Sequence, residues 1–164
     1  MKGYVKNIET VAIENANFRQ VLYTGQHSQL VVMSLKPGED IGMETHVLDQ
    51  FFRVEEGVGE AVLDDLHTQI HAGFAVLVPA GTRHNIINTG NIPLKLYTLY
   101  APPNHRDGVV HPTRADAVKD DEQFDGRPTE RRVLVAGSDA SVSIPVLQRP
   151  RPSLVAVTSP DAGC

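Results

Sequence analysis

Cysteine and tryptophan are nearly absent from this 164-residue chain, which has one Cys and no Trp. The single cysteine is Cys164, so the sequence excludes an internal disulfide and a cysteine-based metal cluster. No apolar run approaches the roughly 18 residues of a membrane span. Residues 1–7 also lack the apolar segment of a signal peptide. We therefore expect a cytoplasmic protein with no membrane contact.

Basic residues are in the minority, and the net charge is −5. A nucleic-acid footprint needs a clustered basic face, so the composition argues against a nucleic-acid partner. The length fits one domain with a substantial hydrophobic core, followed by a possible tail.

Short β-prone segments separated by Gly, Pro and Asp turns dominate the first hundred residues. This spacing is typical of an antiparallel barrel or sandwich. The Asp64-Asp65 pair marks a hairpin turn. Residues 1–14 read as a lead-in strand that pairs at a sheet edge or packs across the barrel. The other expected strands are 18–23, 29–35, 50–55, 60–63, 66–71, 74–78, 83–88 and 92–100.

The character of the chain changes after this region. Thr113 and Asp116 are spaced like a capping box, which predicts a short helix from there to about Glu122. We place the barrel at residues 1–112 and the helix with its loop at 113–126. Residues 127–164 contain five of the eleven prolines, at 128, 145, 150, 152 and 160. They read as a low-complexity, flexible tail, or as an edge strand in a dimer.

Polar side chains at even spacings interrupt the strand pattern at Glu44, His46 and Gln50. Side chains alternate along a strand, so Glu44 and His46 share a face, and Gln50 joins them if no bulge intervenes. A fourth such residue, His84, follows the turn at Pro79.

Two glycine-bracketed motifs contain these residues. The first places Gly38, Glu44, His46, Gln50 and Gly57 with gaps of five, one, three and six residues. The second places Gly73, Pro79, Gly81, His84 and Asn88 with gaps of five, one, two and three. This double pattern resembles the two cupin motifs and covers roughly residues 15–110. The resemblance implies an all-β fold, an antiparallel jelly-roll β-barrel, with a divalent metal held by Glu44, His46, Gln50 and His84.

The first motif departs from the usual pattern at two positions. Glu44 replaces a histidine, and Gln50 replaces a glutamate. The site has either decayed or kept its metal with the anionic ligand moved, since the usual set and this one each carry one negative charge. Two histidines and one carboxylate form the facial arrangement associated with non-haem Fe(II). Without a metal, the same groups would be hydrogen-bonded polar residues in the barrel.

Other polar residues divide by position and parity. His105, in the loop after the last expected strand, is a candidate substrate contact. Tyr97 and Tyr100 have opposite parity, and we assign Tyr100 to the cavity as a second substrate contact. Arg53 and Arg83 are out of phase with the site. Surface positions are expected for His27, His67, His71 and His111.

The resemblance implies a metal-dependent enzyme, such as a dioxygenase, a decarboxylase, or an isomerase acting on sugars or sugar acids. The metal would be Fe, Mn, Ni or Zn and the ligand a small oxygen-rich or carbonyl metabolite. Glu44 is then a candidate general base as well as a ligand. The alternatives are a barrel that binds a metabolite without turnover and a structural barrel whose site has lapsed. Small cupins commonly pair, so we also expect a homodimer.

Overall fold

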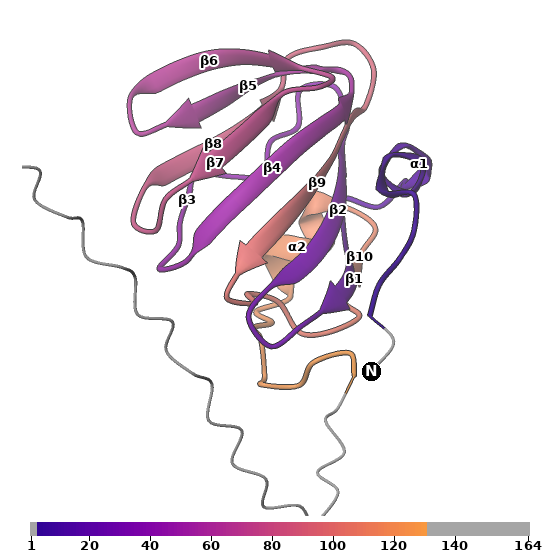
Figure 1. The fold of residues 1–164 in the computed structure, drawn as a ribbon. Helices are drawn as coiled ribbons and strands as arrows, with labels where there is room; N and C mark the ends of the chain where they lie inside the picture. Colours follow the sequence, from indigo (N-terminus) through magenta and orange to yellow (C-terminus); the bar gives the residue numbers. More distant parts are fainter. Residues whose placement is uncertain (1–2, 131–164) are drawn as a thin grey trace, which may run out of the picture. The chain divides into compact units, whose positions relative to one another are not determined.

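Two antiparallel β-sheets face each other in the computed structural model, which describes residues 3–130 within a compact unit, Met1–Arg132 (Figure 1). The larger sheet has the strand order β10-β1-β2-β9-β4-β7 and the smaller one β3-β8-β5-β6. The strands are β1 (Arg19–Thr24), β2 (Gln29–Leu35), β3 (Glu44–Thr45), β4 (Asp49–Glu56), β5 (Val58–Leu63), β6 (Leu66–His71), β7 (Ala75–Val78), β8 (Arg83–Asn88), β9 (Leu94–Ala101) and β10 (Val110–His111).

The hydrophobic core lies between the two sheets because each strand alternates its side chains. On β4, Gln50, Phe52 and Val54 are buried, whereas Phe51 and Arg53 are only partly buried on the other face. The core combines Phe52 and Val54 with apolar residues of both sheets, including Val31, Met33, Leu96 and Ile86. The all-β jelly-roll prediction is therefore confirmed.

The N-terminal segment corrects one prediction. In place of a lead-in strand, residues Ile8–Glu14 form the helix α1. The side chain of Asn7 caps it by accepting a hydrogen bond from the backbone N–H of Thr10. The helix packs against β2, β4 and β9 and buries Ala12 (Figure 1). Helix α1 therefore covers part of the outer face of the larger sheet.

A second helix, α2, spans Arg114–Lys119 and begins with the expected capping box. The Thr113 hydroxyl accepts from the Asp116 backbone N–H, and the Asp116 carboxylate accepts from the Thr113 N–H. The helix ends at Lys119, three residues earlier than predicted. This early end matters because it leaves Glu122 in an extended segment that returns to the barrel.

Of the expected tail, residues 131–164 lie outside the described residues. Residues 127–130 are described. The Thr129 backbone N–H donates to the Thr24 carbonyl, and the Thr24 backbone N–H donates to the Thr129 hydroxyl at the end of β1. In the described part of the chain, no helix is long and apolar enough to cross a membrane.

Candidate metal centre

Glu44, His46 and His84 converge in the space between the two sheets. Glu44 on β3 lies directly opposite His84 on β8 in the strand register. His46 follows β3 by one residue, and its ring centroid is 5.4 Å from that of His84. One ligand atom from each residue lies within 4.8 Å of the others. Ligand atoms about 2.1 Å from one ion are roughly 3 to 4 Å apart, so the cluster is close to the spacing that a metal requires.

The side chains of His84 and Gln50 face each other at the edge of this cluster. His84 Nδ1 lies 3.0 Å from the backbone carbonyl oxygen of Thr82, so Nδ1 carries a proton. Burial lowers the pKa of His84, which favours the neutral ring and leaves a lone pair on Nε2. That nitrogen faces Gln50 Oε1 at 3.0 Å. Two acceptors this close need either a shared cation or a reversed amide whose NH₂ donates to His84.

Glu44 supplies the negative charge of the cluster. Burial raises the pKa of Glu44, but the hydrogen bond and charge of His46, with the charge of Arg19, outweigh burial and hold it below the usual value. The two side chains meet at 3.1 Å between His46 Nε2 and Glu44 Oε2. The carboxylate is therefore ionised and available to a cation.

Tyr100 forms one wall of the cluster. It lies directly opposite Gln50 across the β4–β9 pair and is 2 % exposed. Its ring contacts His46 edge-on, with centroids 6.0 Å apart. Burial raises the pKa of the Tyr100 phenol well above its usual range, so the hydroxyl stays protonated. Tyr97, by contrast, packs against Phe51 on the outer side of the sheet, as the parity predicts.

His105 also packs edge-on against Tyr100, with ring centroids 5.0 Å apart. It is 5 % exposed, so it belongs to the interior and is not simply a loop residue at the mouth. Its Nδ1 is 2.7 Å from the Glu122 Oε1. Burial lowers the pKa of His105, so the ring is neutral and Nδ1–H donates to Glu122.

Glu122 and Arg19 complete this side of the interior. The Glu122 side chain is 1 % exposed and also accepts a hydrogen bond from the backbone N–H of Arg106 at 2.7 Å. Burial alone would raise the pKa of Glu122, but the bonds from His105 and Arg106 hold it below the usual value. Arg19 lies between the two carboxylates, 3.9 Å from Glu44 and 4.0 Å from Glu122.

A groove of about 460 Å³ gives access to these residues from outside. His46 lines one part of it and Glu122 another, so both sides of the polar interior border the same opening. Its other walls are Val47, Leu48, Pro102, Pro103, Asn104, Gln123 and Phe124.

Known proteins resemble this chain in sequence and in fold. Residues 31–100 match the family model described as "Cupin domain". The uncharacterized protein YrkC of Bacillus subtilis is 52% identical over 124 residues, which cover 71% of this chain and 67% of that protein. The crystal structure of BH2720 from Bacillus halodurans is 48% identical, with a TM-score of 0.71 and coverage of 73% of this chain and 96% of that one.

The chain belongs to the cupin family.

Within this cupin, the matched segment contains all four expected metal ligands, Glu44, His46, Gln50 and His84, and also Tyr100. Arg19, His105 and Glu122 lie outside it. Neither Arg19 nor Glu122 was anticipated from the sequence. Arg19 shares the inward parity of Val21, which is a usable signal, whereas Glu122 depends on where α2 ends.

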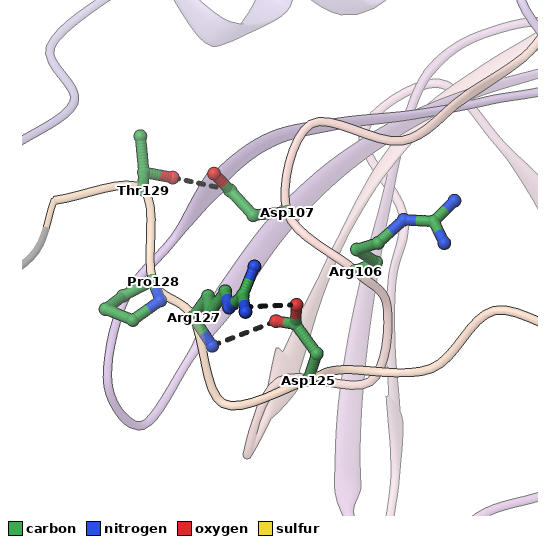
Figure 2. Close-up of a pocket in the computed structure, with 6 residues that line it drawn as sticks. All are labelled: Arg106, Asp107, Asp125, Arg127, Pro128 and Thr129. Atoms are coloured by element: carbon green, nitrogen blue, oxygen red, sulfur yellow. Dashed lines mark hydrogen bonds and ion pairs between the residues drawn. The ribbon is translucent and has the colours of Figure 1, made fainter.

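A second surface hollow of the cupin, of about 360 Å³, lies between residues 106–107 and 125–129 (Figure 2). Its polar groups are largely paired with one another. Arg127 turns back onto Asp125, and the Thr129 hydroxyl donates to Asp107 at 2.6 Å (Figure 2). Arg106 points away and pairs with Asp120. These pairs fix the chain segment after α2, and the polar groups that line the hollow do not converge on a common point where a ligand could bind.

The remaining histidines separate into two groups. His27, His67 and His71 are exposed, as expected. The surface assignment of His111 is wrong, because it is 4 % exposed and its Nε2 lies 3.1 Å from Asp120. This pair ties β10 to the end of α2.

Proposed function

We propose that this cupin binds one divalent transition metal through Glu44, His46 and His84, with Gln50 Oε1 as a weaker fourth contact. The convergence of Glu44, His46 and His84, with one ligand atom of each within 4.8 Å of the others, carries the proposal. A shared cation would also satisfy the facing oxygen of Gln50 and nitrogen of His84. Two imidazoles and one carboxylate suit Fe(II), Mn(II), Ni(II) or Zn(II). The fold fixes the geometry of these ligands, because the Thr82 carbonyl orients the His84 ring and the paired strands β3 and β8 hold Glu44 opposite it.

In this proposal the protein is a small metal-dependent enzyme that acts on an oxygen-rich or carbonyl metabolite. A bound ion supplies Lewis-acid or oxygen-binding chemistry of the kind that dioxygenases, decarboxylases and isomerases use. The groove lined by His46 admits the metabolite, and the buried ring of Tyr100 limits water on the inner side. Glu44 Oε2 contacts His46 and Oε1 lies 3.9 Å from Arg19 Nη2, and in this proposal the ionised carboxylate is the candidate base of the site.

Metal analysis tests the proposal directly. Purified protein is reconstituted in turn with Fe(II), Mn(II), Ni(II) and Zn(II), freed of excess metal and analysed for bound ion. We expect close to one ion per chain in the wild type and loss of that ion in His46→Ala and His84→Ala. The matched control is His67→Ala, which removes an exposed histidine that pairs with Glu60. Failure of all four metals to bind would overturn the proposal.

A metal-loaded protein that binds metabolites without turnover would be the non-catalytic barrel. The expected homodimer and the cytoplasmic location stay predictions. Light scattering on the eluted protein measures the first.

A further inference from the structure

The guanidinium of Arg19 lacks hydrogen bonds despite its burial. Its side chain is 10 % exposed, and among the described residues no acceptor lies within hydrogen-bonding distance. The two nearest carboxylate oxygens, on Glu44 and Glu122, are 3.9 and 4.0 Å away. Nε is buried without a partner. Buried donors are normally satisfied, so this Nε–H points to an acceptor that the described residues do not provide.

A second unpartnered atom lies nearby. His105 Nε2 is buried and has no hydrogen-bond partner. Its other nitrogen donates to Glu122 Oε1, the same oxygen that faces Arg19. Since the ring is neutral, Nε2 carries a lone pair and acts as an acceptor. Arg19 and the Nδ1 of His105 therefore meet at one carboxylate oxygen, and each of the two residues keeps one buried nitrogen without a partner.

The charges of this interior specify what is missing. Glu44 and Glu122 carry one negative charge each and Arg19 one positive charge, so the metal-free interior has a net charge of −1. A divalent metal changes this to +1. Buried charges are stable only when they are compensated, so the metal-loaded interior favours one additional negative charge. A carboxylate meets this requirement, and its two oxygens match the fork of a guanidinium.

We propose that Arg19 and His105 form a ligand subsite beside the metal, and that the subsite binds a small hydroxy acid. The carboxylate of the acid accepts hydrogen bonds from Arg19, and its hydroxyl donates to His105 Nε2. Glu122 positions the imidazole and borders the groove through which the acid enters. This inference rests on the proposed metal site, because without the ion the interior repels an anion.

The test uses L-lactate, propanoate and lactamide as probes, titrated calorimetrically into Mn(II)-loaded protein. Propanoate lacks the hydroxyl and lactamide lacks the charge. We expect lactate to bind about 10-fold or more tightly than lactamide, because only lactate brings a charge to Arg19, and roughly threefold more tightly than propanoate, because the lost hydrogen bond to the neutral His105 ring is weaker. Metal-free protein should bind none of the three.

Variants then assign the preference to residues. In Arg19→Gln, lactate should lose its advantage over lactamide, and Arg19→Lys should restore part of it. In His105→Phe, which keeps an aromatic ring against Tyr100, lactate should bind no better than propanoate. Arg83→Gln is the matched control, because Arg83 is exposed and pairs with Asp65 outside the barrel.

Bound manganese is measured on every sample, so the two proposals fail separately. Wild-type protein that retains no metal would overturn the metal site. Metal-loaded wild type that binds lactate and lactamide equally would overturn the subsite alone and would mean that only water occupies the Arg19 donors.

Discussion

Two groups of polar side chains lie around Tyr100 in the barrel interior and differ in how their charge is compensated. The first side consists of Glu44, His46, Gln50 and His84, and the second of Arg19, His105 and Glu122. On the first side, Gln50 Oε1 and His84 Nε2 present lone pairs to each other. On the second, Arg19 lies near two carboxylates yet forms no hydrogen bond with either. The first group therefore offers acceptors and the second offers donors. The difference fits the two proposals above, in which a metal completes the first group and an anionic ligand the second.

Removing Glu44 should have the largest effect on the first side. Glu44→Ala deletes the one anionic ligand, so we expect at least about 100-fold weaker metal binding. Gln50→Ala removes only a neutral oxygen and should cost about 10-fold. Competition with a metal-sensitive dye measures both affinities. If Gln50→Ala were the more damaging change, Glu44 would not be the charged ligand.

Glu122→Gln tests the second side by itself. The change keeps the size of the side chain but leaves Arg19 with one fewer countercharge and weakens the hydrogen bond from His105. We expect the free energy of unfolding to fall by about 2 to 3 kcal/mol, because the pair is buried. Urea denaturation measures this loss. Metal affinity should change little, and a large loss of metal would show that the two sides are not separable.

The α2 capping box should contribute less. Thr113→Ala removes the hydroxyl that accepts from Asp116, which should lower the free energy of unfolding by about 1 kcal/mol. Thr113→Ser, which preserves the hydroxyl, is the control. Equal stability of the two variants would mean that the cap does not support the segment leading to Glu122.

Mild acidification should have the smallest effect on the free energy of unfolding. Burial lowers the pKa of His84 and of His105, so around pH 6 the unfolded chain binds more protons than the folded one. The stability of metal-free protein should be complete above the unfolded pKa of about 6.5 and decline as the pH falls below it. Thermal unfolding followed from pH 8 to 5.5 measures the decline. His105→Phe should reduce its slope, and an unchanged slope would exclude His105 as a contributor.

The sequence predicted the first side of the interior far better than the second. Glu44, His46 and His84 occur at the spacings of two motifs, and the strand β4 beside them alternates buried and partly buried side chains from Gln50 to Val54. Alternation fixes which face each side chain occupies, and the pairing of β3 with β8 that brings His84 to Glu44 is what the motif resemblance implied.

The features that the sequence did not predict, helix α1 and the inward position of Glu122, depend on long-range contacts. Ile8–Glu14 is rich in β-branched residues and resembles a strand, but packing on the larger sheet buries Ala12 and favours the helix. Glu122 enters the barrel because α2 ends at Lys119 and because the following segment is fixed at two points far away in sequence. Neither contact leaves a local pattern.

Those two points have a further consequence. The Phe124 backbone N–H donates to the Asn104 carbonyl, and the Thr129 N–H donates to the Thr24 carbonyl. The first bond lies only two residues after Glu122, so together with the end of α2 at Lys119 it sets how far the Glu122 side chain reaches inward. Inserting or deleting one residue between Lys119 and Phe124 would change the acidity and reach of the inner wall while the proposed cation ligands stayed in place. Ligand preference in this barrel can therefore diverge through its outer connections alone.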